Sequence, residues 1–273
     1  MTDFKQVEQK ANEIRINSLK MVHAANSGHP GGSLSIADIL ASLYFGGHLK
    51  HNPKNPEDPN RDILVQSKGH ASPALYSCLG LAGFFPIEET MSFRQLGSRF
   101  QGHIDRMRVP GVEISTGSLG HGLSNSVGIA LAAKLDKHPR RVFAILSDGE
   151  LQEGSNWEAA MSAAHFKLSN LTAIVDRNRI QLDGWTETTM GLDPLPDKFK
   201  AFNWEVIEIN GHNLEQIDQA LTKAAALGTG EKPIMIIAST IKGKGVSFME
   251  DQVAWHGVAP QDADLANALK ELV

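Results

Sequence analysis

Two polar residues that could hold a divalent cation follow apolar stretches of the chain, thirty positions apart. Asp148 comes directly after "RVFAILS" (residues 141–147), and Asn178 closely follows "LTAIVD" (residues 171–176). Carboxylate and amide oxygens are hard donors that suit Mg²⁺ or Ca²⁺, with phosphate oxygens filling the remaining positions. An acid at the end of a buried strand is costly to leave unpaired. The pair therefore points to a cation and a phosphate-bearing ligand, although Asp148-Gly149 alone is typical of a simple turn.

Five of the eleven histidines share a second chemical context, because each stands next to a glycine in a stretch expected to be a loop or a strand exit. Small neighbours let a ligand approach the backbone, and imidazole donates, accepts or moves protons near neutral pH. These five predict a site lined by imidazoles: His29, His70, His103, His121 and His256. Four others are expected to be structural, one in the middle of a helix and three exposed: His165, His48, His51 and His138.

Apolar periodicity predicts the elements that must position these residues. Helices are expected over 4–25, 34–45, 72–83, 122–137, 154–167 and 213–227, with the first ending at "NSGHPGG", where Gly28 and Pro30 break helices. Strands are expected over 62–67, 141–147, 171–176, 204–209 and 233–239, and residues 96–119 are expected to be irregular.

Continuous apolar strands that alternate with helices indicate a parallel sheet covered on both faces. The predicted fold is therefore α/β, a doubly wound, mostly parallel sheet with helices on both faces, formed by residues 1–273 as one domain. In such sheets ligands bind beyond the carboxyl ends of the strands. Asp148 and Asn178 are expected to converge there, and the helix entered near Gly154 would aim its positive end at the same region.

Composition narrows the class of protein. The 273 residues carry a net charge of −5, with 41% hydrophobic and 21% charged residues, so nothing indicates a nucleic-acid partner. The single Cys78 excludes an internal disulfide and fits a reducing compartment. The polar N-terminus is unlike a signal peptide, and no apolar run approaches a membrane span. The expectation is a soluble, cytoplasmic protein.

Several common enzyme signatures are missing from the sequence. No strand is followed by G-x-G-x-x-G, and neither a phosphate-binding G-x-x-x-x-G-K-[ST] loop nor a G-x-S-x-G nucleophile turn is present. The zinc motif H-E-x-x-H is also missing. Dinucleotide binding, P-loop hydrolysis, nucleophile-elbow catalysis and thiolate or H-E-x-x-H zinc chemistry are therefore not supported.

Taken together, several stretches resemble the N-terminal, diphosphate-binding region of transketolase, a thiamine-diphosphate enzyme. The resemblance runs from "SGHPGGSLS" at residue 27 to "WHGVAP" ending at residue 260. The stretches between them, in the same order as in that family, are "RDILVQSKGHASPALY", "FRQLGSRFQGH", "PGVEISTGSLGHGLSNSVGIALAAK", "SDGELQEGSNWEAAM" and "NLTAIVDRNRIQLDG". The family's thiamine signature, an Asp-Gly pair followed downstream by Asn, is matched by Asp148, Gly149 and Asn178.

The resemblance implies a role for each matching residue. Asp148, Asn178 and the carbonyl of Ile180 would hold Mg²⁺, with Ca²⁺ as a substitute, against the diphosphate of the cofactor. Gly149 and His70 would contact that diphosphate.

The same resemblance implies further contacts beyond the diphosphate. The loop "TGSLG" would bind the cofactor largely through its backbone, at Gly117, Ser118 and Leu119. Three catalytic histidines would line the approach to the reactive carbon, moving protons and gripping sugar hydroxyls: His29, His103 and His256, the last also a cofactor contact. Glu153 resembles the acid that couples cofactor sites across a dimer.

The chain also departs from the family pattern. Ser147 stands where glycine is usual, and Ser118 and His121 replace Pro and Gln. His121 is expected either to add a polar contact or to cap the following helix. The aminopyrimidine-binding domain and its catalytic Glu are missing, which suggests the N-terminal subunit of a split transketolase. A partner chain would supply that half, and sugars or sugar phosphates would be the substrates, in a hetero-oligomer such as an αβ pair doubled into a heterotetramer.

The predicted reaction is transfer of a two-carbon ketol unit from a ketose to an aldose, in the pentose phosphate pathway or a catabolic route for an unusual sugar. Three alternatives stay open at this point. They are the α component of a thiamine-dependent 2-oxoacid dehydrogenase, a synthase that condenses pyruvate with a sugar aldehyde, and a cofactor-binding subunit without catalysis. The motif "SGHPGGSLS" and the histidines favour transketolase over the dehydrogenase.

Overall fold

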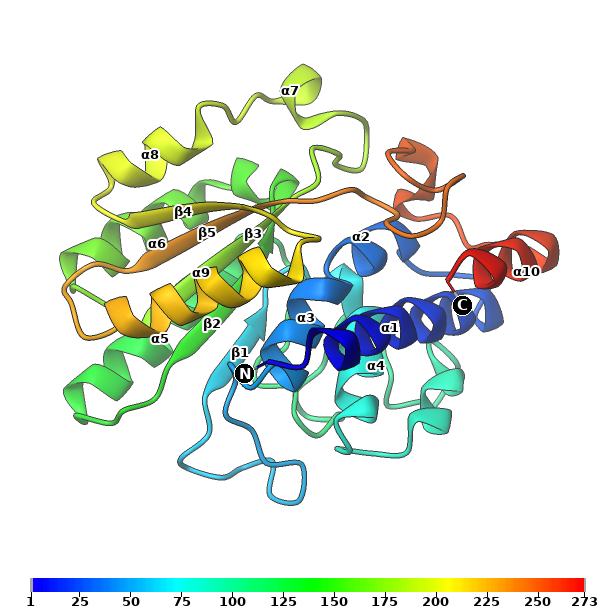
Figure 1. The fold of residues 1–273 in the computed structure, drawn as a ribbon, viewed down its shortest axis with the longest axis horizontal. Coiled ribbons are helices and arrows are strands. Elements are labelled where there is room, and N and C mark those ends of the chain that lie inside the picture. Colours follow the sequence, from blue (N-terminus) through cyan, green and yellow to red (C-terminus); the bar gives the residue numbers. More distant parts are fainter. Residues whose placement is uncertain (1, 273) are drawn as a thin grey trace.

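The computed structural model describes residues 2–272 and is built around one parallel sheet (Figure 1). Its strands run in the order β1-β2-β3-β5-β4. They are β1 (Ile63–Gln66), β2 (Val142–Ser147), β3 (Leu171–Arg177), β4 (Glu205–Asn210) and β5 (Ile234–Ser239). All four pairings are parallel, and β2 and β3 end in register, with Ser147 opposite Asp176. The predicted doubly wound α/β fold is confirmed.

Helices cover both faces of the sheet because successive strand residues point to opposite sides. Phe143, Ile145 and Ile174 pack into a core with the helices on one face, which include α9 and α1 on the viewer's side of Figure 1. Ala144 and Leu146 pack into the core on the other face. The first face carries α1 (Phe4–Ala24), α3 (Ala37–Phe45), α4 (Ser72–Leu81) and α9 (Leu214–Leu227), and the second α5 (His121–Leu135), α6 (Gly154–His165) and α8 (Leu195–Ala201).

The prediction of one helix over 34–45 is wrong. The chain forms α2 (Pro30–Ser35), turns at Ile36 and continues as α3. Pro30 begins α2 instead of only ending the helix before it, because the first position of a helix needs no backbone N–H donor and suits the fixed φ of proline. The short α2 leaves His29 at its N-cap, which brings that imidazole to the edge of the sheet.

The strand β4 lies at one edge of the sheet, and its residues are half-buried or exposed, as expected for a strand with one unpaired side. Both faces are covered there too, because α8 and α9 contact β4 from opposite sides. Three helices were not predicted: α7 (Thr186–Thr189), α8, and α10 (Asp262–Glu271), which lies beside α1 in Figure 1. Residues 96–119 form no helix or strand, as predicted.

Four 3-10 turns complete the described elements: η1 (Gly69–Ala71), η2 (Ile87–Ser92), η3 (Gly149–Gln152) and η4 (Val253–His256). The turn η3 lies between Asp148 and α6. The Asp148 carboxylate therefore accepts a hydrogen bond from the Gly149 N–H and not from the first residues of α6.

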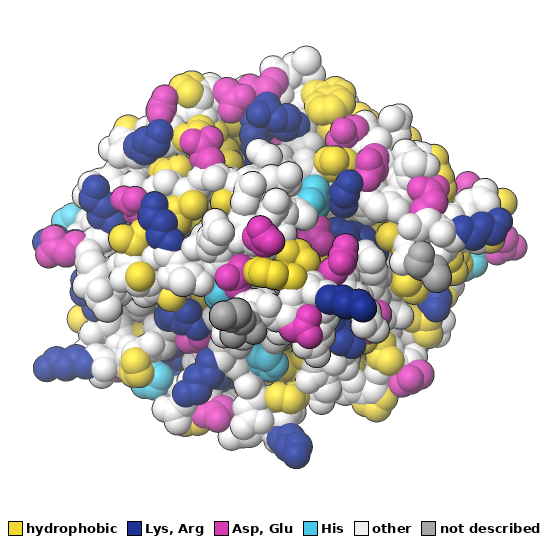
Figure 2. Space-filling view, in the orientation of Figure 1, with side chains coloured by type: hydrophobic (Ala, Val, Ile, Leu, Met, Phe, Trp, Pro, Cys, Tyr) yellow, Lys and Arg dark blue, Asp and Glu magenta, His cyan; other side chains and the backbone are white. Residues whose placement is uncertain are grey.

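The surface carries charges of both signs without a dominant patch on the face drawn in Figure 2. Within residues 2–272, no helix has the length and apolar character needed to cross a bilayer. The single Cys78 is free and buried.

Candidate functional site

A cavity of about 340 Å³ opens at the carboxyl ends of β1, β2 and β3, where parallel sheets bind ligands. Most of the residues proposed from the sequence line this cavity. They are His29, His70, His103, Gly117, Leu119, Gly149, Glu153, Asn178, Ile180 and His256. The structure thus brings together segments more than two hundred positions apart, although the role predicted for each residue stays a prediction.

Four of the five glycine-flanked histidines form one cluster. The ring of His29 lies 5.2 Å from His70, 6.2 Å from His103 and 5.5 Å from His256, measured between ring centroids. His70 and His256 stack at 5.5 Å. The cluster forms because the four rings project from loops that converge on the same edge of the sheet.

The clustered imidazoles are neutral at physiological pH. Burial, with the Arg94 guanidinium nearby, lowers the pKa of His29 to about 4. Burial and Lys242 lower the pKa of His256 to about 3. Burial, chiefly, also lowers the pKa values of His70 and His103. Neutral imidazoles can each donate one hydrogen bond and accept another, which suits contacts with hydroxyl groups.

We expect His29 to stay neutral in the folded chain until the pH falls to about 4. The unfolded chain would protonate it near 6.5, so between 6.5 and 4 the unfolded state binds more protons. The stability that this group contributes is therefore complete above pH 6.5 and is lost as the pH falls through that window. Nuclear magnetic resonance of labelled histidines, assigned with His29→Gln, measures the titration. A His29 resonance that titrates near pH 6.5 would contradict the expectation.

Two buried lysines line the cavity and were missed in the sequence. Lys68 follows β1, donates to the carbonyl of Gly32 at 3.0 Å and is ion-paired with Asp176. Although burial alone would raise it, the pKa of Asp176 is lowered because Lys68 faces the carboxylate. The two residues are 108 positions apart, so no local spacing signals the pair.

Lys242 is the second missed lysine. Its ammonium group donates to the carbonyl of Ile180 at 2.8 Å and lies 2.7 Å from Nδ1 of His256. Burial and Lys68 lower the pKa of Lys242 to about 7. When Lys242 is protonated it donates to Nδ1, and the ring proton of His256 is then on Nε2. Lys68 and Lys242 together make this part of the cavity attractive to an anion.

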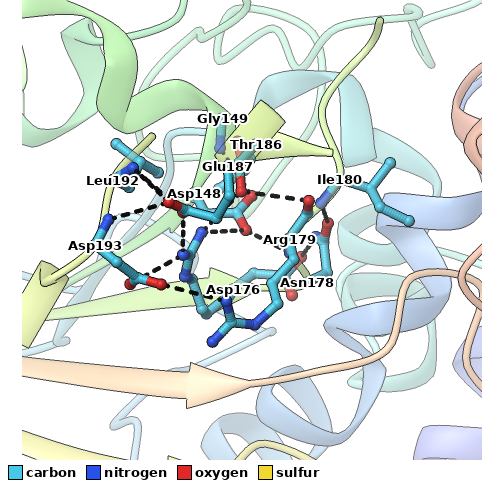
Figure 3. Close-up of polar contacts among 12 residues, drawn as sticks. Asp148, Gly149, Asp176, Asn178, Arg179, Ile180, Thr186, Glu187, Leu192 and Asp193 are labelled. Carbon is cyan, nitrogen blue, oxygen red and sulfur yellow. Dashed lines mark hydrogen bonds and ion pairs between the residues drawn. The ribbon is translucent and has the colours of Figure 1, made fainter. Parts of the chain in front are cut away.

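Asp148 and Asn178 lie at the ends of neighbouring strands, as predicted, and Figure 3 shows them with Ile180 at the same edge. The amide of Asn178 is oriented at both ends, since its nitrogen donates to Asp176 at 2.9 Å and its oxygen accepts from the Ile180 N–H at 3.1 Å. The oxygens expected to hold a cation are thus anchored by the local backbone.

Asp148 has protein partners of its own. Its side chain is fully buried beneath the cavity floor, between the lining residues Ser147 and Gly149. It accepts from the Gly149 N–H at 2.8 Å and from the Arg179 N–H at 2.5 Å, and the Arg177 guanidinium lies at 3.2 Å. Burial and the neighbouring Asp176 nevertheless raise the pKa of Asp148 to about 6.

Glu150 is a third buried acid at the site, and it was not singled out in the sequence. It accepts from the hydroxyl of Ser67, from the Gly120 N–H at 2.9 Å and from the Ser147 N–H at 3.2 Å. Burial raises its pKa. This carboxylate joins the ends of β1 and β2 to the loop of Gly117 and Leu119, and so fixes that loop at the cavity wall.

Several of the other proposed residues lie differently. Ser118 is exposed and is not among the residues that line the cavity. His121 is also exposed outside it, and its side chain does not cap α5, whose N-cap is Gly120. His165 is the last residue of α6 and not mid-helical. The three histidines expected to be exposed are half-buried, and each has a hydrogen-bond partner: His48 contacts Asp218, His51 the Leu49 carbonyl and His138 the Arg140 N–H.

Residues 6–272 match the family model of the transketolase, thiamine diphosphate binding domain. The chain therefore belongs to the transketolase family.

Two similar relatives have nearly the same length as this chain. A 6-deoxy-6-sulfo-D-fructose transketolase subunit of Clostridium sp. (strain MSTE9) is 44% identical over 97% of this chain and 96% of its own. An apulose-4-phosphate transketolase subunit of Actinobacillus succinogenes is 41% identical over 98% and 96%. A solved transketolase from Campylobacter jejuni superposes with a TM-score of 0.92 at 40% identity, over 98% of this chain but 43% of its own.

These matches confirm the predicted family, the fold and a transketolase-type transferase component, and they favour it over the dehydrogenase and synthase alternatives. Both of these relatives are named as subunits of a transketolase.

Proposed function

We propose that this chain is the half of a two-chain transketolase that binds the diphosphate and cation of thiamine diphosphate, with residues 1–273 acting as one domain. The enzyme would transfer a two-carbon ketol unit from a ketose to an aldose. The observation that carries the proposal is the cavity at the strand ends, which combines oxygen donors, two ammonium groups and four neutral imidazoles. Thiamine diphosphate, when bound, supplies the electron sink for breaking a carbon–carbon bond beside a carbonyl.

The donor set fits a magnesium ion. A carboxylate, an amide oxygen and a carbonyl, from Asp148, Asn178 and Ile180, are the hard ligands that Mg²⁺ prefers when phosphate oxygens complete its shell. Ca²⁺ accepts the same donors and would serve as a substitute. Among residues 2–272 there is no cluster of three or more His, Cys, Asp or Glu side chains able to hold a metal, so the proposal depends on the mixed set.

The cationic lining fits a diphosphate. Lys68 and Lys242 offer ammonium groups beside His70 and the glycine at position 149, and an added side chain there would strike Gln181 at 2.8 Å. The backbone of Gly117 and Leu119 would hold the rest of the cofactor, with Ser118 contributing only through its backbone because its side chain points to solvent.

The histidines would do the proton work on the sugar. His29, His103 and His256 stay neutral at working pH. His103 can donate to one oxygen and accept from another as hydroxyl protons move. By contrast, Nδ1 of His29 faces the Arg94 guanidinium and Nδ1 of His256 faces Lys242, which leaves these two rings to donate from Nε2. Glu153, at the cavity rim, would reach toward a second copy of the site across an oligomer interface.

The partner chain would supply the aminopyrimidine pocket, its catalytic Glu and the remaining sugar contacts, in a heterotetramer of two such pairs. Relatives are named for 6-deoxy-6-sulfo-D-fructose and apulose-4-phosphate. We therefore propose a ketose with an anionic sulfonate or phosphate group as donor, in a catabolic route and not in the pentose phosphate pathway. The lone, buried Cys78 supports a reducing, cytoplasmic setting.

The test mixes the purified chain with its partner chain, Mg²⁺ and thiamine diphosphate, and follows ketol transfer from a panel of ketose phosphates and sulfonated ketoses. We expect transfer that requires all four components. Failure to transfer from every donor, with the complex assembled and cofactor bound, would contradict the proposal. Transfer from the panel without the partner chain would refute the division of labour.

A further inference from the structure

Arg177 is a buried cation at the candidate site to which the proposed function assigns no role. It is the last residue of β3, and its side chain is 3% exposed. Its guanidinium contacts four acceptors. One nitrogen lies 3.2 Å from Asp148 and 3.0 Å from the hydroxyl of Thr186. The other lies 2.6 Å from Glu187 and 3.1 Å from Asp193.

These contacts connect the two parts of the chain that supply the proposed cation ligands. Asp148 follows β2, whereas residues 186–193 close the segment that begins after β3 with Asn178 and Ile180. Within that segment the Thr186 N–H donates to the Arg179 carbonyl at 2.8 Å, and Ile180 pairs with Trp185 in an antiparallel bridge. A displacement of residues 186–193 would therefore move the Ile180 carbonyl. In Figure 3, Asp148, Glu187 and Asp193 surround the same point.

The positive charge of Arg177 disfavours a cation nearby, whereas its contacts hold the proposed cation ligands in place. A guanidinium beside a cation ligand repels the cation, and the repulsion is appreciable at these distances in a protein interior. Three carboxylates around Arg177 outnumber its single charge, however. Arg179 shares Asp193 with Arg177, and the Lys242 ammonium lies 2.8 Å from the Ile180 carbonyl. The carboxylates thus offset the nearby cations, and the planar fork of Arg177 fixes the positions of its acceptors.

We propose that Arg177 is a positioning residue for the cation site, tying the Asp148 carboxylate to residues 186–193 so that the Asp148 and Ile180 oxygens are held for one ion. The proposal rests on the proposed function, because it assumes that these oxygens bind a divalent cation with thiamine diphosphate. Arg177 itself touches neither the cation nor the substrate.

The experiment titrates the chain, assembled with its partner, with Mg²⁺ in saturating thiamine diphosphate and measures the half-saturating Mg²⁺ concentration by calorimetry, with the melting temperature recorded for each protein. Arg177→Gln is expected to raise the half-saturating concentration about 10–100-fold, the effect usual for residues that orient metal ligands. Arg177→Lys keeps the charge but loses the planar fork of the guanidinium. Its half-saturating Mg²⁺ concentration should lie between those of the unaltered chain and of Arg177→Gln.

Thr186→Val changes no charge and nearly no volume, so it separates positioning from electrostatics. It removes one acceptor of the fork, and we expect about a two- to tenfold increase in half-saturation. The matched control is Arg61→Gln, which breaks an equally close Arg–carboxylate fork with Glu113 (2.7 and 2.8 Å) before the amino end of β1. It should lower stability without changing the Mg²⁺ titration.

The outcomes separate this inference from the function on which it rests. Tighter Mg²⁺ binding by Arg177→Gln, or an unchanged titration in Thr186→Val, would overturn the positioning role while leaving the cation site intact. If Arg61→Gln raised the half-saturating Mg²⁺ concentration as much as Arg177→Gln does, the effect would reflect a general loss of stability. That result would also overturn the positioning role of Arg177. Absence of any Mg²⁺-dependent binding by the unaltered chain would refute the proposed function itself.

Discussion

Replacing Asp148 with alanine is expected to abolish the Mg²⁺-dependent retention of thiamine diphosphate. The carboxylate is the only charged group in the proposed ligand set, so its loss removes the main attraction for a divalent cation. We expect affinity to fall on the order of a hundredfold or more, beyond the effect of losing an orienting residue. Equilibrium dialysis with and without a chelator measures the retained cofactor.

Loss of the Asp148 carboxylate also removes one of three carboxylate partners of the buried Arg177, so the variant should lose some stability, below the roughly 3–5 kcal/mol expected when a buried charge keeps no partner. The control must therefore match that cost. Asp62→Ala removes another buried aspartate, paired with Arg141 at 2.7 Å at the opposite end of the sheet. It should destabilise the chain yet retain the cofactor. Full cofactor retention by Asp148→Ala would rule out the metal assignment.

Replacing His103 with alanine is expected to separate turnover from cofactor binding. His103 comes from the irregular segment over 96–119 and lines the cavity beside Gly117, where an added side chain would meet the ring at 3.1 Å. Loss of a positioned proton-transfer group lowers turnover by about 10²–10⁴-fold. The cofactor should still bind, because the cation and diphosphate contacts are untouched.

The measurement pairs ketol transfer by the complex with calorimetry of cofactor binding. His121→Ala is the matched control, since His121, like His103, stands next to a glycine but is exposed outside the cavity. A His103→Ala enzyme that turns over at full speed would remove His103 from the catalytic set. A variant that no longer binds the cofactor would show that His103 serves binding and not turnover.

The parallel topology made the position of the site predictable from the sequence. Once "RVFAILS" and "LTAIVD" were recognised as successive parallel strands, their ends had to meet at one edge, and Asp148 and Asn178 do so. The glycine context located four clustered histidines for a similar reason, because loops at strand ends carry both. His121 shared the context but begins a helix, which turns its ring to solvent.

The buried cations could not be predicted in the same way. Lys68 pairs with Asp176 across 108 positions, and Arg177 reaches Asp148 across 29. Such pairs depend on which strands are neighbours, and local periodicity does not encode strand order. The same limit explains why β5 was not placed between β3 and β4.

The central claim is that Asp148, Asn178 and the Ile180 carbonyl bind a divalent cation that anchors the diphosphate of thiamine diphosphate. Calorimetric titration of the chain, assembled with its partner, with thiamine diphosphate in Mg²⁺ and again in chelator tests it directly. We predict saturable binding of one cofactor per chain in Mg²⁺ and none in chelator. Equal binding under both conditions, or no binding in either, would contradict it.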